Sequence, residues 1–139
     1  MKPPRLKPAP PASRTKAAWR QALGGQARKA GHASEWIAAL WLMLRGYQIL
    51  GFRLKGRAGE IDILARRGRV LAVVEVKQRT SLAAALEAVS LDQRERLRRA
   101  GESLAARRRG MAGLAVRLDL IALAPGKFPR HSPDAWKGT

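Results

Sequence analysis

Apolar residues recur at helical spacing between about residue 31 and Arg45, and Gly46 then supplies a helix stop. Trp36, Leu40, Met43 and Leu44 share one face of this helix, and Ile37 and Trp41 widen it. So wide an apolar face predicts a helix packed firmly on a sheet.

A second helical pattern covers residues 81–109 and ends at Gly110. Ser90 is followed three residues later by Gln93, which is the spacing of a capping box. The pattern therefore predicts a short helix, a break and a longer helix that begins at Leu91.

β-rich segments fill much of the remaining chain, at residues 47–54, 60–65, 70–77 and 114–123. The order helix, three strands, helix, strand predicts an α/β domain with a mixed sheet of about four to five strands flanked by helices. The third and fourth strands would be joined by a crossover through the long helix. We expect residues 1–18 to form a disordered, basic, proline-rich arm and residues 19–139 a single domain that ends in a wrapping tail.

The charge of the chain points to a polyanionic partner. Lysine and arginine total 28 against ten acidic residues, a net charge of +18. The first 31 residues hold eight bases and no acid, so the rest still carries 20 bases against ten acids. Nucleic acid is the commonest polyanion, and we expect DNA rather than RNA. The alternative is a basic protein from a GC-rich genome, with no such partner.

Other aspects of composition exclude several classes of protein. The chain has no cysteine, which excludes disulfides and thiolate metal sites. Its longest apolar run, residues 36–44, is about half of the roughly 18 residues that a membrane span requires. We therefore expect no membrane association and a cytoplasmic location.

The second and third strands form a predicted hairpin that gathers acidic residues. With Arg67-Gly68 as the turn and Arg66 opposite Arg69, Asp62 would face Val73 and Glu60 would face Glu75. Because side chains alternate along a strand, one face would carry Glu60, Asp62, Val73, Glu75 and Lys77. The opposite face would be an apolar core face of Ile61, Ile63, Val74 and Val76.

Three of the ten acids on one small face would repel one another unless something offsets their charge. A divalent cation does this, and carboxylate oxygens suit Mg²⁺ or Mn²⁺. Lys77 would contact phosphate or orient an attacking water, as phosphodiester hydrolysis requires. The alternative is an exposed charged face with salt bridges to arginines.

The motifs Gly59-Glu60-Ile61-Asp62 and residues 74–79, V-E-V-K-Q-R, resemble the core of the PD-(D/E)XK nuclease superfamily. More narrowly, they resemble the bacterial YraN-like family of predicted endonucleases, which is related to Holliday-junction resolvases. This resemblance implies a restriction endonuclease-like three-layer fold. It also implies a homodimer, by analogy with the resolvases alone.

By this resemblance, Asp62 and Glu75 would be metal ligands and Lys77 the catalytic lysine, with Glu35 as a further candidate ligand. Several residues would support the site: Glu60, Gln78, Arg79 and Gln93. Gln93 stands where the family often has lysine. The segment Arg117-Leu118-Asp119 resembles a fourth-strand motif of the family, to which we assign a structural role.

Four arginines are candidate nucleic-acid contacts: Arg94 and Arg98 on the second helix, and Arg66 and Arg67 at the hairpin turn. The alternative for each is a solvated surface residue. Together, these observations predict a metal-dependent endonuclease acting on structured or branched DNA. The alternatives are a nucleic-acid-binding module of the same fold that cleaves little or not at all, and a basic protein-interaction scaffold.

Overall fold

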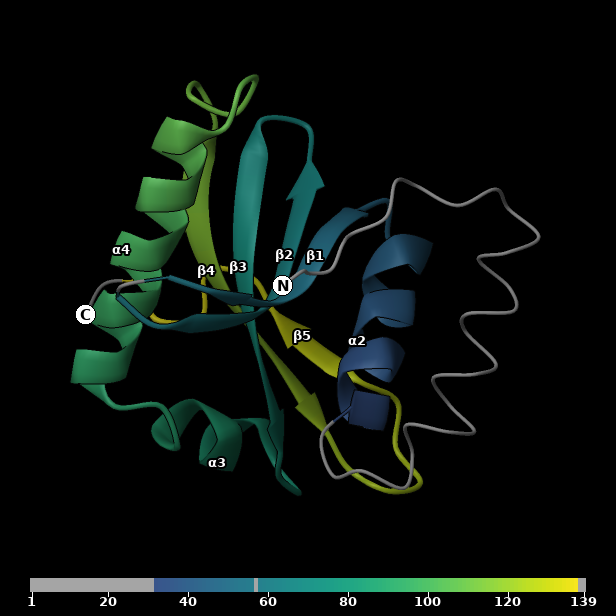
Figure 1. Ribbon diagram of the computed structural model, residues 1–139. Helices are drawn as coiled ribbons and strands as arrows, with labels where there is room; N and C mark the ends of the chain where they lie inside the picture. The colour runs from purple at the N-terminus through teal and green to yellow at the C-terminus, as the bar shows by residue number, and fades with distance from the viewer. Residues whose placement is uncertain (1–31, 57, 138–139) are drawn as a thin grey trace.

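The computed structural model of the protein describes residues 32–56 and 58–137 (Figure 1). The expected arm, residues 1–18, lies outside the described residues. Eight elements follow one another in the order α2 (His32–Leu44), β1 (Gln48–Lys55), β2 (Glu60–Arg67), β3 (Val70–Gln78), α3 (Leu82–Glu87), α4 (Leu91–Arg107), β4 (Ala115–Leu123) and β5 (Arg130–Ser132).

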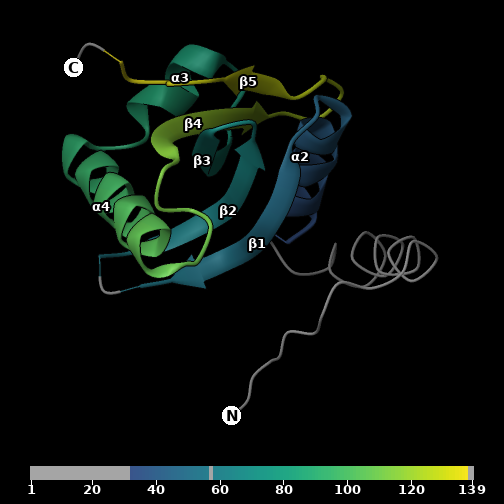
Figure 2. The same ribbon diagram turned by 90° about the horizontal axis from the view of Figure 1, so that it is seen from above.

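The strands form one five-stranded sheet in the order β1-β2-β3-β4-β5. β3 and β4 run parallel and the other neighbours antiparallel, so the sheet is mixed. Helix α2 covers one face, and α3 and α4 cover the other, as Figure 2 shows. The three-layer α/β architecture expected from the sequence is confirmed.

The core is divided by the sheet. On one face, Leu42 of α2 packs with Ile63 and Val74. On the other, Leu97 of α4 packs with Leu64 and Val73. β2 and β3 therefore contribute apolar side chains to both faces along most of their length, as is typical of strands buried between two helical layers.

The crossover between β3 and β4 has the expected form: a short helix, a break and a longer helix. Ser81 caps α3 by accepting a hydrogen bond from the backbone of Ala84, and Ser90 caps α4 by accepting one from Gln93. The side chain of Gln93 does not return to the cap. Its amide nitrogen donates to Glu75 on β3 instead, so the cap holds this glutamine against the sheet.

The predicted orientation of α2 is wrong. Its buried residues are Glu35, Ala38, Ala39 and Leu42, whereas the larger apolar residues Ile37, Leu40, Met43 and Leu44 are exposed. Two fully buried alanines allow the helix backbone to approach the sheet closely. The helix is apolar almost all round, so its sequence pattern could not select the buried face.

The predicted hairpin register is also wrong, by two residues. Arg67 pairs with Val70, and Gly68-Arg69 form the turn, because the positive φ of 62° at Gly68 suits a tight two-residue turn. Asp62 therefore does not face Val73, which pairs with Leu64. A shift of two residues preserves the alternation of faces, so Asp62 and Glu75 still lie on the same side of the sheet.

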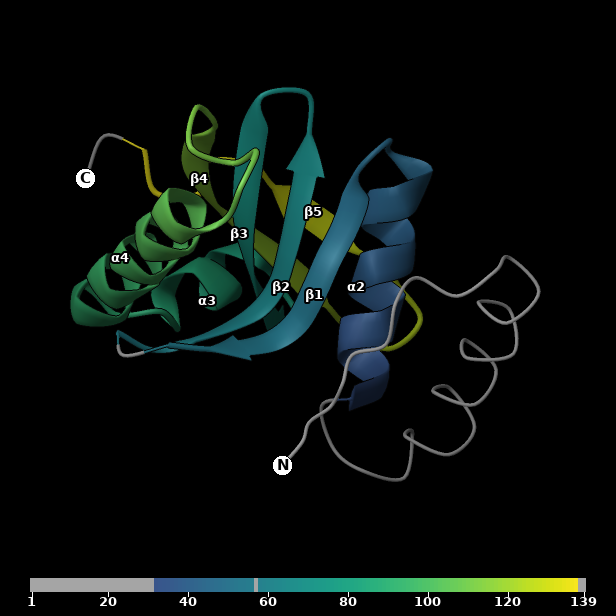
Figure 3. The ribbon, with the colours of Figure 1, turned by 45° about the horizontal axis from the view of Figure 1, so that its top comes forward.

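The expected apolar face is interrupted at one position. Ile61 packs with the cluster beneath α4, while Ile63 packs with the cluster beneath α2. Regular pairing between β2 and β3 ends at Ile63 and Val74. Beyond this point β2 pairs only with β1, and the two strands curl together towards α4 (Figure 3).

The segment that follows β4 contains a strand where the sequence predicted only a wrapping tail. β5 pairs antiparallel with β4 through three residue pairs, from Leu120 with Ser132 to Ala122 with Arg130. In the part of the chain that the structure describes, no helix combines the length and apolar character needed to cross a membrane.

Candidate active site

The candidate site lies where β2 and β3 separate. The last regular pair of this ladder is Ile63 with Val74. One residue further on, the Asp62 carboxylate accepts a hydrogen bond of 2.9 Å from the backbone N–H of Val76. The side chain of Asp62 thus takes the place of a backbone acceptor, and its carboxylate is drawn beside β3.

Asp62 and Glu75 face each other closely enough to share a hydrogen bond between their carboxyl groups. Glu75 is 5% exposed and has two further partners. Its Oε2 atom lies 3.6 Å from Nζ of Lys77 and accepts a hydrogen bond of 3.2 Å from Nε2 of Gln93. The structure thus brings together the three residues that the sequence proposed as catalytic, and Gln93 with them.

The pair carries a costly negative charge. Burial raises the pKa of Glu75 to about 7, and the neighbouring Asp62 adds to this, whereas Lys77 opposes it. Burial also raises the pKa of Asp62, against the lowering effect of its hydrogen bond from Val76. Two carboxyl groups in contact, one buried and one half-buried, need a shared proton or a cation to offset their repulsion.

A cleft of about 250 Å³ opens onto this pair. It is lined by Gly59, Glu60, Asp62, Glu75, Gln93, Arg96 and Leu97. Glu60 lies at its exposed margin. Arg96 forms an ion pair with Asp92 one turn earlier on α4 and borders the carboxylates. The sequence pattern does not distinguish Arg96 from the other arginines of this helix, because only the packing of α4 places it beside the carboxylates.

Glu35 does not join the carboxylate pair as a third ligand. Its carboxylate pairs at 3.0 Å with Arg53 of β1, and within residues 32–56 and 58–137 no cluster of three or more acidic or histidine side chains could hold a metal. Burial raises the pKa of Glu35, against the effect of Arg53, and the charges of Asp62 and Glu60 raise it further. Glu35 therefore lies within electrostatic reach of the site, but outside direct contact.

Arg53 has an unusual backbone conformation. Its φ of 51° lies in the left-handed region, which is rare for a residue with a side chain. It stands between the pairs Phe52–Ile63 and Leu54–Ile61, opposite Asp62 in the ladder. The sequence does not predict this conformation, because arginine is not a residue type that indicates a left-handed backbone position.

Gln78 and Arg79 continue β3 away from the carboxylates. Gln78 donates a hydrogen bond to Ser34 of α2, and Arg79 donates to the carbonyl of Gln78. Arg130 of β5 in turn donates to the carbonyl oxygens of Arg79 and Thr80. Their contacts connect the end of β3 to α2 and β5, and support of the carboxylate site by these two residues stays a prediction.

The four arginines proposed as nucleic-acid contacts lie outside the carboxylate cleft. Arg94 stacks over the ring of Trp136 and donates to the carbonyl of Val89, and Arg98 is exposed further along α4. Arg66 and Arg67 are at the far end of β2. There, Arg66 bonds to its own turn and Arg67 lies over the ring of Tyr47.

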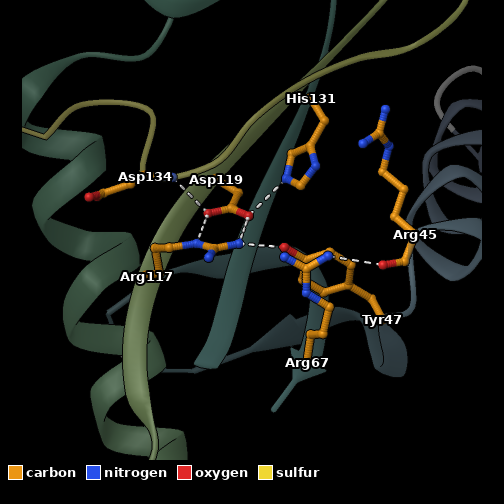
Figure 4. Close-up of polar contacts among 7 residues, drawn as sticks. All are labelled: Arg45, Tyr47, Arg67, Arg117, Asp119, His131 and Asp134. Carbon is orange, nitrogen blue, oxygen red and sulfur yellow. Dashed lines mark hydrogen bonds and ion pairs between the residues drawn. The ribbon is translucent and has the colours of Figure 1, made fainter. Parts of the chain in front are cut away.

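A second polar cluster lies between β4, β5 and the start of β1 (Figure 4). The fully buried Asp119 accepts two hydrogen bonds of 2.7 Å from Arg117 and lies 2.8 Å from His131. Arg117 also donates to the hydroxyl of Tyr47. These contacts join β4 to β5 and to the residue before β1, and a structural role for the Arg117-Leu118-Asp119 segment stays a prediction.

The residues present suit a divalent cation. Asp62 and Glu75 supply adjacent carboxylate oxygens. Burial chiefly raises the pKa of both groups, and a bound cation would favour the charged forms that burial disfavours. Mg²⁺ and Mn²⁺ are commonly held by one or two carboxylates together with water and substrate phosphate. The cleft leaves room for such water and phosphate on the open side of the pair.

Comparisons with known proteins agree on the family. Residues 34–123 match the sequence profile of the Uncharacterised protein family UPF0102. A UPF0102 protein of Caulobacter vibrioides is 66% identical over 119 residues, which are 86% of this chain and 95% of that protein. A UPF0102 protein of Paramagnetospirillum magneticum is 48% identical over 80% of this chain and 89% of its own.

One solved structure is similar in part. It is Hjc, a Holliday junction resolvase of Archaeoglobus fulgidus, which is 24% identical and matches with a TM-score of 0.44. The match covers 71% of this chain and 72% of the resolvase.

Proposed function

The chain belongs to the Uncharacterised protein family UPF0102, and we propose that it is a divalent-metal-dependent nuclease that hydrolyses phosphodiester bonds in DNA. One observation carries the proposal. The buried carboxyl group of Glu75 and the half-buried one of Asp62 are in contact at an open cleft, and the ammonium group of Lys77 lies 3.6 Å from Glu75.

The expected chemistry follows from this arrangement. Asp62 and Glu75 would hold Mg²⁺ or Mn²⁺, which when bound makes a coordinated water more acidic and stabilises charge on phosphate oxygens. Lys77 would contact the phosphate at which negative charge develops. Gln93 would keep the Glu75 carboxylate oriented through its hydrogen bond, and the backbone N–H of Val76 would do the same for Asp62.

The substrate class rests on charge and resemblance. A net charge of +18 favours a polyanion, and phosphate contacts are the general basis of DNA affinity. The resemblance of the Gly59–Asp62 and Val74–Arg79 motifs to the YraN-like family, which is related to junction resolvases, supports structured or branched DNA as the substrate.

A cleavage assay tests the proposal. The full chain is incubated with branched, single-stranded and duplex DNA in Mg²⁺, Mn²⁺ or EDTA, beside Asp62→Ala, Lys77→Ala and the exposed-acid control Glu87→Ala. We expect metal-dependent cleavage that Asp62→Ala and Lys77→Ala each reduce roughly a hundredfold or more, because each removes a group that acts in the transition state. Glu87→Ala should cleave normally.

Three results would contradict the proposal in different ways. Cleavage that persists in Asp62→Ala would come from elsewhere or from a contaminant. Binding of DNA without cleavage, over all substrates and metals, would support the alternative of a nucleic-acid-binding module. Failure to bind DNA at low salt would exclude both.

A further inference from the structure

A second and larger cleft lies next to the carboxylate site, between α4 and the hairpin of β1 and β2. Its volume is about 710 Å³, within the roughly 300–1,000 Å³ typical of ligand pockets. From the hairpin it is lined by Leu54, Lys55, Gly56, Ala58 and Ile61, and from α4 by Arg99, Ala100, Glu102, Ser103, Leu104 and Arg107. We refer to it as the α4 cleft.

The α4 cleft and the carboxylate site lie next to each other along one seam, by which we mean the line where the β1–β2 hairpin meets α4. Ala58 and Ile61 line the α4 cleft, whereas their chain neighbours Gly59 and Asp62 line the carboxylate site. Between them the hairpin touches α4, since a Cβ atom on Gly59 would lie 3.8 Å from Cβ of Arg96. The curl of β1 and β2 towards α4 in Figure 3 creates this seam.

The α4 cleft has an apolar floor and a cationic rim. Ile61 and Ala100 are buried members of the apolar cluster beneath α4, and Leu54 and Leu104 pack against that cluster. Lys55, Arg99 and Arg107 supply three positive charges against the single acid Glu102. The rim therefore carries a net positive charge.

The cations of the rim are only weakly engaged by the protein. Arg99 lies 4.0 Å from Glu95, an exposed pair on one helix face, which is worth little. Arg107 donates one bond to the carbonyl of Ser103. Within the described parts of the chain, neither Lys55 nor Arg107 has a carboxylate at ion-pair distance.

We propose that the α4 cleft binds an unpaired nucleic-acid strand that continues from the phosphate held at the carboxylate site. An unpaired strand exposes the faces of its bases, which can pack on apolar surface and on arginine guanidinium planes, while its phosphates meet the cations. Paired duplex keeps those faces stacked inside and would gain nothing from the apolar floor. This inference rests on the proposed function, because it places the strand relative to the scissile bond.

Binding measured without cleavage tests the inference separately. The probes are a fluorescein-labelled blunt DNA hairpin and the same hairpin with an unpaired thymidine tail, both in EDTA, with affinity measured by anisotropy. For the unchanged protein, we expect the tail to increase affinity about tenfold, within the range that alanine substitution gives for stacking of one base on a protein.

Two variants alter the cleft in different ways. Lys55→Ala/Arg107→Ala removes rim charge, and Ser103→Trp fills the cleft from an exposed helix position without changing charge. Each should abolish most of the tenfold advantage of the tail and leave affinity for the blunt hairpin within about twofold. Arg45→Ala, an exposed arginine that follows α2 on the opposite face of the sheet, is the control and should retain the advantage.

Several outcomes would overturn the inference. The first is a tail that adds no affinity to the unchanged protein. The second is a cleft variant that loses affinity equally for the tailed and the blunt hairpin. The third is a Ser103→Trp protein that still binds the tailed hairpin tenfold more tightly than the blunt one. Displacement of the tail by an oligo-glutamate peptide as strongly as by oligothymidine would identify the cleft as a general site for acidic chains. A protein that binds the tailed probe through this cleft but cleaves nothing would leave the inference standing while the proposed function fails.

Discussion

The ionised carboxyl group of Glu75 lowers the stability of the fold as the pH rises, whereas most acidic residues stabilise the fold when they are ionised. Its folded-state pKa is raised from 4.5 to about 7, chiefly by burial. A raised pKa means that the folded protein disfavours the charged form. Stability is then fully present below about pH 4.5 and is lost as the pH rises towards 7. At about 1.4 kcal/mol per pH unit, the loss amounts to about 3 kcal/mol.

Removal of this charge should therefore stabilise the metal-free protein. For Glu75→Gln we expect an increase in unfolding free energy of up to about 3 kcal/mol at pH 8 in EDTA, and almost none at pH 4. Urea unfolding across this pH range measures it, with the exposed Glu87→Gln as control. A Glu75→Gln protein that is less stable than the original at pH 8 would show that the charge is not costly.

At the residue scale, the sequence predicted which residues gather at the site better than it predicted the contacts that they make. Alternation along β2 and β3 placed Asp62, Glu75 and Lys77 on one side, and a register shift of two residues left that result unchanged. The contact between Asp62 and the Val76 N–H depends on where the ladder ends, which no pattern of residue types encodes. The pairing of Glu35 with Arg53 was beyond prediction for the same reason, since it depends on a left-handed residue inside a strand.

At the scale of the element, α2 shows how a strong periodic signal can indicate the wrong face. Leucines at positions 40 and 44 form part of a wide stripe, yet Leu44 is 73% exposed and Leu42 is fully buried. The sheet surface beneath the helix is already filled by Ile63 and Val74. Small residues and one leucine fit this surface, and the larger side chains point outwards.

This orientation predicts unequal effects of two similar substitutions. Leu42→Ala should lower the free energy of unfolding by about 2–5 kcal/mol, because it leaves a cavity between α2 and the sheet. Leu40→Ala should cost less than about 1 kcal/mol, because Leu40 is 43% exposed. Urea or thermal unfolding distinguishes them, and equal costs would restore the orientation predicted from the sequence.

Helix α4 approaches the sheet closely at Gly101. A Cβ atom at this position would lie 2.5 Å from Cγ2 of Val73 and 3.0 Å from Cγ1 of Val116. In most helix interiors Gly→Ala gains about 1 kcal/mol. Here the overlap with the buried Val73 and the half-buried Val116 should cost about 1–3 kcal/mol.

We therefore expect Gly101→Ala to destabilise the protein despite its favourable helix propensity. The reason is checked by a double-mutant cycle with Val73→Ala, which removes the overlapping methyl groups. Val73→Ala should cost less in the Gly101→Ala background than in the original chain. Independent effects of the two substitutions would mean that the helix does not approach the strand as described.

At the scale of the whole molecule, Asp119 connects parts of the chain that are distant in sequence. It joins Arg117 of β4, His131 of β5 and the backbone N–H of Asp134 in the tail. Through Arg117 it also reaches Tyr47 at the start of β1, as Figure 4 shows. Strand β5 has only three residues and no strong β pattern, so the sequence predicted a tail here. Buried side-chain contacts, which the local pattern does not reveal, fix it as a strand.

These contacts also determine how the molecule should respond to acid. Burial alone would raise the pKa of Asp119, but hydrogen bonds from Arg117, His131 and Asp134 outweigh it and hold the pKa below its ordinary value of 3.8. Because the pKa is lowered on folding, the stability that Asp119 contributes is fully present above its ordinary pKa of 3.8. This stability is lost as the pH falls through the pKa of the folded state. Asp119 therefore stabilises the fold at neutral pH, whereas Glu75 destabilises it there in the absence of metal.

Substitution of Asp119 should release the C-terminal part of the molecule before the rest. For Asp119→Ala we expect a loss of about 3–5 kcal/mol, because the Arg117 charge and the His131 ring lose a buried partner. Hydrogen exchange should rise first in residues 130–137 and least in α2, because only the former are held by Asp119. Asp134→Asn keeps the backbone N–H that Asp119 accepts and serves as the control. Uniform acceleration in both regions would mean that Asp119 stabilises the domain as a whole, without a separate role in fastening β5 and the tail.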